Sequence, residues 1–156
     1  MSRSESAIFT NLCMVSDGNG NVLVQDRRNP DWPGVTFPGG HVEKKESFVE
    51  SVIREVYEET GCVCDEIQEL GIVAENRASL DYTQINYYFV VTTTHTPGEN
   101  HLTEAEQDSH TVVEWHTFDE MVRLINEQEF DRVQGKYLKA RDVVALREYA
   151  KRVIVL

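Results

Sequence analysis

The sequence predicts an α/β domain of the α+β kind, an α/β/α sandwich in which one mixed β-sheet lies between helices. Three observations lead to this fold class. The 156 residues are enough for one hydrophobic core and too few for two ordinary domains. Strand-like and helix-like segments alternate without a regular βαβ repeat, and the last predicted strand precedes two helices. We therefore expect residues 1–156 to form a single domain.

The composition excludes several classes of protein. Hydrophobic residues make up 40% of the chain and charged residues 27%, which is typical of a globular protein. No apolar run reaches the roughly 20 residues of a membrane-spanning helix. With 15 basic and 27 acidic residues, the formal charge of −12 disfavours a protein that grips nucleic acid by its phosphates. Three cysteines without a paired spacing, and no visible secretory signal, indicate a cytoplasmic protein.

A hairpin and a loop are predicted at the start of the chain. Ile8–Val15 has the apolar pattern of a buried strand, and a glycine-rich turn separates it from a second strand at Val22–Val24. Residues 27–34 contain two prolines and a glycine and are therefore expected to form a loop. Val35–Phe37 is a short extended piece, which Pro38-Gly39-Gly40 is expected to end.

The first helix is predicted from its end signals. Ser47 and Glu50 have the spacing of a capping box, in which the hydroxyl and the carboxylate each bind a free amide at the helix start. The helix should continue to Glu59 and end at Thr60-Gly61. Apolar residues at three- and four-residue spacings predict a single face packed on the sheet: Phe48, Val49, Val52, Ile53 and Val56.

The remaining elements follow from the same patterns. Further strands are predicted within Val63–Glu75, at Gln84–Thr94 and at Thr111–Trp115. A helix after Thr117 should bury Phe118, Met121, Val122 and Ile125. A last helix should bury Leu138, Val143, Leu146, Tyr149 and Val153.

Three glutamates in the first helix form the clearest candidate site. Glu55, Glu58 and Glu59 stand three and four residues apart and project from nearly one side of the helix. Like charges at these spacings repel one another unless a cation lies among them. Carboxylate oxygens suit Mg²⁺, with Mn²⁺ as a second possibility, whereas a helix without an EF-hand loop is a poor Ca²⁺ site. An ordinary acidic helix surface is the alternative explanation of the spacing alone.

The residues around these glutamates resemble a known family. Gly40, Glu46 and the run from Arg54 to Gly61 have the spacing of the Nudix box, which covers residues 40–62. The one departure is Cys62, where the pattern has a larger aliphatic residue. Segments outside the box are also similar, and the whole is most similar to the MutT-like branch of bacterial Nudix proteins.

The resemblance implies a reaction and a set of site residues. Nudix hydrolases cleave a nucleoside diphosphate linked to another group, using divalent cations, and cations would also let an acidic chain bind a polyphosphate. The residues that match family metal ligands are Glu55, Glu58, Glu59 and the Gly39 carbonyl; Glu55 is alternatively the general base. The catalytic set would then comprise Glu55, Glu58, and Arg54 with Glu46 as the brace between loop and helix.

Substrate contacts are less defined by the sequence. Arg27 and Arg28 precede the loop that leads to the box, where an arginine can reach a phosphate or base, and Arg77 is a lesser candidate. Gly40 would let the backbone approach the substrate closely. The family often adds a carboxylate from a later loop, for which the candidates are Glu104, Glu106 and Asp108.

The activity expected from the resemblance is that of a MutT-like nucleoside triphosphate pyrophosphohydrolase. Oxidised nucleotides such as 8-oxo-dGTP would be its substrates, and nucleoside monophosphate and pyrophosphate its products. The alternatives are a nucleotide-sugar or dinucleotide pyrophosphatase and, in another class, a non-catalytic Nudix domain that binds a nucleotide and regulates a partner. The expected partner is a small nucleotide, with no nucleic acid and no membrane, and the protein is expected to be a monomer or homodimer.

Overall fold

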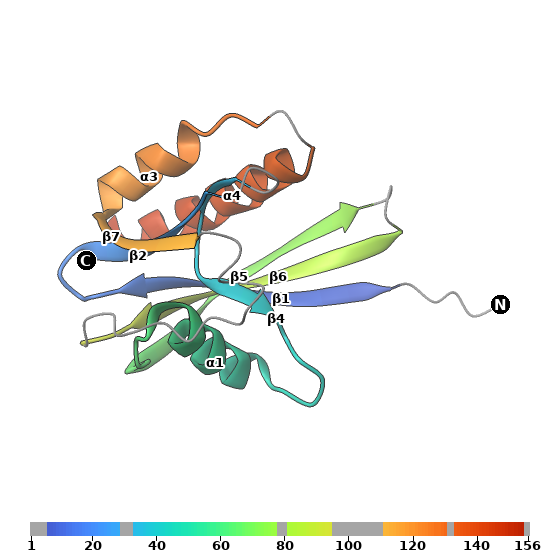
Figure 1. Cartoon of the computed structure of the whole chain (residues 1–156), viewed down its shortest axis with the longest axis horizontal. Coiled ribbons are helices and arrows are strands. Elements are labelled where there is room, and N and C mark those ends of the chain that lie inside the picture. Colours follow the sequence, from blue (N-terminus) through green and yellow to red (C-terminus); the bar gives the residue numbers. More distant parts are fainter. Residues whose placement is uncertain (1–5, 29–32, 78–80, 95–110, 131–132, 155–156) are drawn as a thin grey trace.

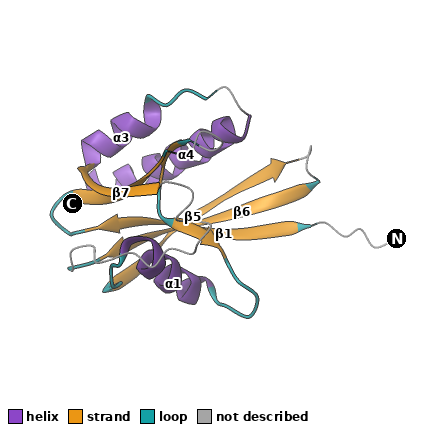
Figure 2. Cartoon of the chain, viewed as in Figure 1, coloured by secondary structure: helices purple, strands orange, loops and turns teal. Residues whose placement is uncertain are grey.

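The predicted mixed sheet between helices is confirmed. The computed structural model describes residues 6–28, 33–77, 81–94, 111–130 and 133–154. Within these ranges one sheet of seven strands carries helix α1 on one face and helices α3 and α4 on the other (Figures 1 and 2). Each face of the sheet therefore has a hydrophobic core of its own.

The sheet is mixed because its two central strands run parallel. The strands are β1 (Ala7–Ser16), β2 (Asn21–Arg27), β3 (Gly34–Thr36), β4 (Gly39–His41), β5 (Glu66–Arg77), β6 (Tyr82–Thr92) and β7 (Thr111–Thr117). Their main order is β3-β2-β1-β6-β5, while β4 pairs with β1 and β7 pairs with β2. Strands β1 and β6 are parallel along the whole of β1, and the other pairs are antiparallel.

Successive side chains of β1 point into the two different cores. The helices are α1 (Phe48–Thr60), α3 (Phe118–Asn126) and α4 (Val133–Ile154). Leu12 and Met14 point into the core under α3 and α4, whereas Cys13 and Val15 point into the core under α1. Met121 and Ile125 of α3 and Leu146 of α4 are buried as predicted. The prediction for Val153 concerns a side chain outside the described residues.

Strand β4 corrects the prediction that Pro38-Gly39-Gly40 only ends an extended piece. Gly39–His41 pairs antiparallel with β1, with Gly39 opposite Leu12 and His41 opposite Thr10. Strand β2 pairs with β1 only at Ser16 and Val22, so β4 takes the edge of β1 that β2 leaves open. This arrangement fixes the start of the predicted box against the centre of the sheet.

The predicted apolar face of α1 is wrong in two positions. Val52 and Val56 are buried, but Val49 and Ile53 are each 48% exposed. The helix is turned so that polar residues take inward positions, because these side chains have polar partners in the sheet and in β4. The buried polar residues of α1 are Ser51, Glu55, Glu59 and Thr60.

Both ends of α1 agree with the prediction. The Ser47 side chain accepts a hydrogen bond from the amide of Glu50 at 3.1 Å. Gly61 has φ of 72°, a left-handed conformation that favours glycine, and its amide donates to the Tyr57 carbonyl. The reciprocal capping box occurs at α3, between Thr117 and Glu120, whereas the described bonds of α1 contain only the Ser47 half.

The cysteines lie in and beside the core under α1. Cys13, Cys62 and Cys64 are free thiols, as their odd count and spacing predicted. Burial raises the pKa of the Cys13 thiol well above its ordinary value, so this side chain packs as a small apolar group. Among the described helices, none has the length and apolar character needed to cross a membrane.

Candidate active site

Arg54 connects the loop before α1 to the acidic residues of the helix. Its Nε and Nη2 donate to the two carboxylate oxygens of Glu46 at 2.7 and 2.9 Å. Its Nη1 donates to Glu55 at 2.9 Å and to Glu58 at 3.2 Å, and Nη2 also reaches the His41 carbonyl. The hydrogen bonds that Arg54 donates to Glu46 raise the pKa of Arg54 above its ordinary value. The predicted brace between loop and helix is therefore present as a bidentate ion pair.

The ion pair predicts how stability depends on pH. Hydrogen bonds from Arg54 lower the pKa of Glu46 below its ordinary value of 4.5. The ion pair therefore adds to the free energy of unfolding. This stabilisation is fully present above the pKa of Glu46 in the unfolded chain, and it is lost as the pH falls through the lower pKa of Glu46 in the folded protein. We expect Glu46→Gln to reduce the loss of stability on acidification below pH 4.5, measured by urea unfolding at several pH values. An unchanged pH dependence would show that the pair contributes nothing to acid unfolding.

Two glutamates of α1 lie against the backbone of β4. The Glu59 carboxylate accepts a hydrogen bond from the Gly39 amide at 2.8 Å. A Cβ on Gly40 would lie 2.5 Å from Oε1 of Glu55. Gly39 has φ of +153°, and its Cβ would lie 2.1 Å from the carbonyl oxygen of Asn11. The two glycines thus allow the strand to approach both the helix carboxylates and β1, which side chains would prevent.

The donor set fits a hard divalent cation. Glu55 and Glu59 are buried, Glu58 is partly buried, and the first two lie at the Gly39-Gly40 backbone. All these ligands are oxygens, as Mg²⁺ and Mn²⁺ prefer. Across the described ranges, however, no three acidic, histidine or cysteine side chains converge in a preformed metal cluster. Arg54 holds the carboxylates of Glu55 and Glu58 instead.

The structure separates the two candidate arginines. Arg28 points to the surface, with Nε 3.1 Å from Asp26 and more than half of its side chain exposed. Arg27 is partly buried at the end of β2, and burial lowers the pKa of its guanidinium. Arg141 lowers that pKa further, while Glu59 opposes the shift. Of the two arginines, Arg27 is therefore the one on which the charge of Glu59 acts.

The three candidate loop carboxylates lie outside the described residues. Glu104, Glu106 and Asp108 fall in the segment between β6 and β7, residues 95–110. Their place relative to Glu55 and Glu59 stays a prediction.

Sequence reasoning missed a buried polar cluster on the other face of the sheet. Asp142 of α4 accepts hydrogen bonds from the Tyr88 hydroxyl at 2.6 Å, from Thr36 at 3.0 Å and from Arg141 at 3.2 Å. Burial and the Asp142 charge raise the pKa of Tyr88 well above its ordinary value. Arg141 also donates to Asn86 at 3.1 Å. The one signal in the sequence was an Arg-Asp pair within the otherwise apolar face of α4.

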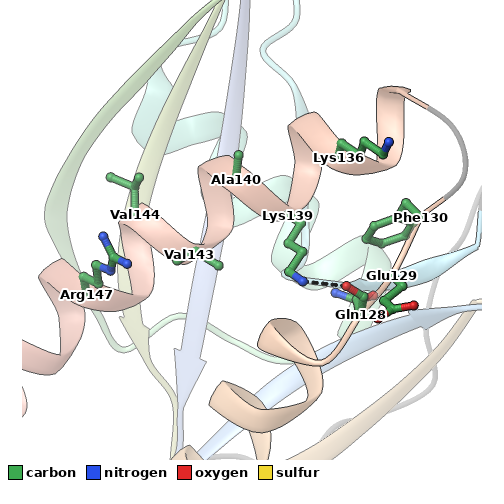
Figure 3. A pocket seen from close by; sticks show the side chains of 9 residues that line it. All are labelled: Gln128, Glu129, Phe130, Lys136, Lys139, Ala140, Val143, Val144 and Arg147. Carbon is green, nitrogen blue, oxygen red and sulfur yellow. Dashed lines mark hydrogen bonds between the residues drawn. The ribbon is translucent and has the colours of Figure 1, made fainter.

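A pocket elsewhere on α4 contains none of the predicted site residues. It lies between α4 and the segment that follows α3, and its lining includes Phe130, Lys136, Lys139, Val143 and Arg147 (Figure 3). The Lys139 ammonium donates to the Gln128 carbonyl at 2.6 Å, which joins α4 to that segment at the pocket. The basic residues of the last helix thus lie partly on this surface rather than at the glutamates of α1.

The comparisons with known proteins identify the family. The family model described as the NUDIX domain matches residues 10–139, which is most of the chain. The chain belongs to the Nudix family. The match includes the whole Nudix box, helices α1 and α3 and the first part of α4, as far as residue 139. The resemblance predicted from the box is confirmed, and with it the assignment of the chain as a Nudix hydrolase, a pyrophosphohydrolase enzyme.

Solved structures show the same Nudix fold at low sequence identity. A MutT NUDIX hydrolase from Burkholderia pseudomallei is 19% identical, with a TM-score of 0.64 over 92% of this chain and 98% of that chain. A NUDIX hydrolase from Nitrosomonas europaea, also 19% identical, has a TM-score of 0.68 over 94% and 90%. The MutT protein from Methanosarcina mazei Go1 is 20% identical, with a TM-score of 0.62 over 90% and 95%. These likenesses support the MutT-like form of the fold.

Proposed function

We propose that the protein hydrolyses nucleoside triphosphates, in particular oxidised ones such as 8-oxo-dGTP, to nucleoside monophosphate and pyrophosphate. The observation that carries the proposal is the position of Glu55 and Glu59 at the Gly39-Gly40 backbone, with Arg54 bracing the helix. Several structural neighbours are named MutT, which agrees with this substrate class. We further propose that residues 1–156 act as one catalytic domain in the cytoplasm, as a monomer or homodimer.

The proposed cofactor is Mg²⁺, with Mn²⁺ as a substitute. Glu55, Glu58, Glu59 and the carbonyl of Gly39 would hold it. Bound among these ligands, the cation supplies charge neutralisation for the polyphosphate and lowers the pKa of coordinated water. The need for such a cation follows from the net charge of −12, which by itself repels a triphosphate.

The protein residues have separate tasks in the proposed reaction. The oxygen of a water molecule bonds to phosphorus, the bond from that phosphorus to the pyrophosphate oxygen breaks, and the proton of the water passes to a carboxylate. Glu55, in place of its role as a metal ligand, is the candidate for that carboxylate because its side chain is buried at Gly40. Arg54 positions Glu55 and Glu58, and Arg27 would bind the phosphates from the end of β2.

Binding of the cation predicts a change in thermal stability. We expect millimolar Mg²⁺ or Mn²⁺ to raise the thermal midpoint by mass action, since a ligand of the native state alone stabilises it. The measurement is differential scanning fluorimetry, with Ca²⁺ at equal ionic strength as the control for screening. A midpoint that responds equally to all three salts would contradict a specific Mg²⁺ site.

The activity itself is tested on a panel of substrates. We expect release of pyrophosphate from 8-oxo-dGTP and other nucleoside triphosphates in the presence of Mg²⁺. The panel also contains nucleotide sugars and dinucleotides. Selective cleavage of these compounds would show that the leaving group is not pyrophosphate and that the protein is a nucleotide-sugar or dinucleotide pyrophosphatase. If metal binds but no compound with a diphosphate bond is cleaved, the protein is a nucleotide-binding regulator and the proposal is wrong.

A further inference from the structure

Helix α1 is rotated away from the orientation that would bury the most apolar surface. At about 100° per residue, the apolar face predicted from the sequence and the set of buried residues on α1 have centres about 40° apart around the helix axis. As a result, three large apolar side chains of the helix, Val49, Ile53 and Tyr57, are 47% or 48% exposed. Hydrophobic burial alone therefore favours a different rotation of this helix.

A chain of buried hydrogen bonds joins the helix to the central strand in the observed rotation. Nδ2 of Asn11 on β1 donates to Oγ of Ser51 at 2.8 Å, and the Ser51 hydroxyl donates to the Phe48 carbonyl at 2.6 Å. The Cys13 thiol donates to Oδ1 of Asn11 at 3.7 Å. Asn11, Cys13 and Ser51 are all fully buried. A buried polar group that is paired in one arrangement and unpaired in another favours the first arrangement.

Two further bonds join α1 to β4, and both are more open to water. Arg54 donates to the His41 carbonyl at an exposed position, and the bond from the Gly39 amide to Glu59 is only partly buried. Water can replace a lost partner in such bonds, whereas loss of the buried bond would leave polar groups without water. The contact between Asn11 and Ser51 therefore has the larger effect on the rotation.

The position of Ser51 determines where two buried glutamates lie. Ser51, Glu55 and Glu59 are four residues apart and form one row along the helix. Glu55 lies against the Gly40 backbone, and Glu59 accepts from the Gly39 amide at 2.8 Å. A rotation of about 40°, at a helix radius of about 5–6 Å, would move these side chains by about 4 Å. The bond from the Gly39 amide would then be broken.

We propose that Asn11 and Ser51 are positioning residues, which hold α1 in the rotation that places its buried glutamates at β4. They do so against the hydrophobic preference of the helix. This inference rests on the proposed function, in which Glu55 and Glu59 hold the cation at the β4 backbone. Neither Asn11 nor Ser51 is among the proposed ligands, so their contact can be altered while every carboxylate stays in the chain.

The test replaces both partners of the contact by apolar groups. The double variant Asn11→Leu with Ser51→Ala leaves neither partner facing an unpaired one, so its thermal midpoint should stay within about 3 °C of that of the unaltered protein. We expect kcat to fall about tenfold to a hundredfold, because displaced groups lose their alignment with the substrate. Retained stability with lost turnover is the result that a merely structural contact would not give.

The Gly39 amide gives a readout that needs neither metal nor substrate. In the metal-free protein its hydrogen exchange can be followed by NMR. Exchange should be at least about tenfold faster in the double variant, because Glu59 no longer accepts the bond from this amide.

Removing the hydrophobic preference of α1 should restore the rotation. Val49→Gln with Ile53→Gln, added to the double variant, should recover most of the lost kcat and the slow exchange at Gly39, because glutamine at these positions favours contact with water. Both side chains are about half exposed, so the same two substitutions in the unaltered protein should leave kcat nearly unchanged.

The matched control is Thr10→Val, next to Asn11 on β1. The Thr10 hydroxyl donates to Asn86 at 2.8 Å on the opposite face of the sheet, so its loss removes a buried bond that does not contact α1. This variant should have a lower thermal midpoint, with kcat and the exchange of the Gly39 amide unchanged.

Two outcomes overturn the inference. A double variant with unchanged kcat and unchanged exchange at Gly39 would show that other contacts set the rotation. A loss of kcat that Thr10→Val reproduces, or that the two glutamines do not recover, would show a structural role only. If the unaltered protein cleaves no nucleotide, the exchange at Gly39 still tests the rotation, so the proposed hydrolysis and the positioning role fail separately.

Discussion

Replacing Glu59 by glutamine should lower kcat by at least about a hundredfold, the usual loss when one preorganised electrostatic group is removed from an active site. Glu59 is buried, and its carboxylate accepts a hydrogen bond from the Gly39 amide. A glutamine oxygen can keep that bond, so the helix and β4 should stay together. The negative charge is lost, and with it a ligand that a hard cation requires. The measurement is steady-state release of pyrophosphate at saturating Mg²⁺.

The matched control is Glu50→Gln in the first turn of the same helix. Glu50 is exposed, and it is its backbone amide that donates to the Ser47 cap, so the side-chain change should leave both kcat and the thermal midpoint nearly unaltered. A normal thermal midpoint in Glu59→Gln would separate lost chemistry from lost folding. A kcat of Glu59→Gln close to that of the unaltered protein would contradict the assignment of Glu59 as a metal ligand.

Gly39→Ala should be among the most destabilising substitutions in the chain. The added Cβ would lie 2.1 Å from the carbonyl oxygen of Asn11 and 2.9 Å from the Cα of Leu12. Both contacts are to backbone atoms of β1, which no side-chain rotation can relieve. Overpacking of this kind costs about 1–3 kcal/mol, and the positive φ adds about 1–3 kcal/mol of backbone strain. Urea unfolding followed by circular dichroism measures the sum.

Gly71→Ala separates the two contributions. Gly71 has φ of +154°, almost the value at Gly39, but no atom lies within 4 Å of its added Cβ. The control should therefore show the backbone strain alone. We expect Gly39→Ala to lose about 1–3 kcal/mol more than Gly71→Ala. Equal losses in the two variants would mean that β4 moves away from β1 at little cost and that the register of the box is loosely held.

The Nudix box was the most predictable part of the molecule because its spacing is local. The helix ends follow from Ser47 and Gly61, and the approach of Arg54 to Glu46 and Glu58 follows from positions on one helix and the loop before it. Such contacts depend on a short stretch of chain, so the sequence pattern determines them.

Contacts between distant segments could not be predicted in the same way. Strand β4 exists because β2 diverges from β1, and periodicity within three residues cannot show that. The inward turn of α1 depends on the bond from Asn11 to Ser51 at 2.8 Å. The bonds of Asp142 to Thr36 and Tyr88 join residues far apart in sequence. In each of these contacts the polar partner lies on another element. Hydrophobic spacing alone therefore favoured a different orientation for α1 and gave no indication of the Asp142 contacts.

The parallel pairing of β1 with β6 has a consequence for the order of folding. Ala7 is opposite Thr83 and Ser16 is opposite Thr92, so the central pair of strands closes a loop that contains the entire Nudix box. Closing so long a loop costs chain entropy before any contact between the strands repays it, which slows folding. On a ribosome, the full β1–β6 pairing must wait until residue 92 has been synthesised, and until then the core around Val52 and Val56 lacks Phe89 and Val91 of β6. The core that supports the hydrolytic centre is consequently completed late, after β1 and β6 have met.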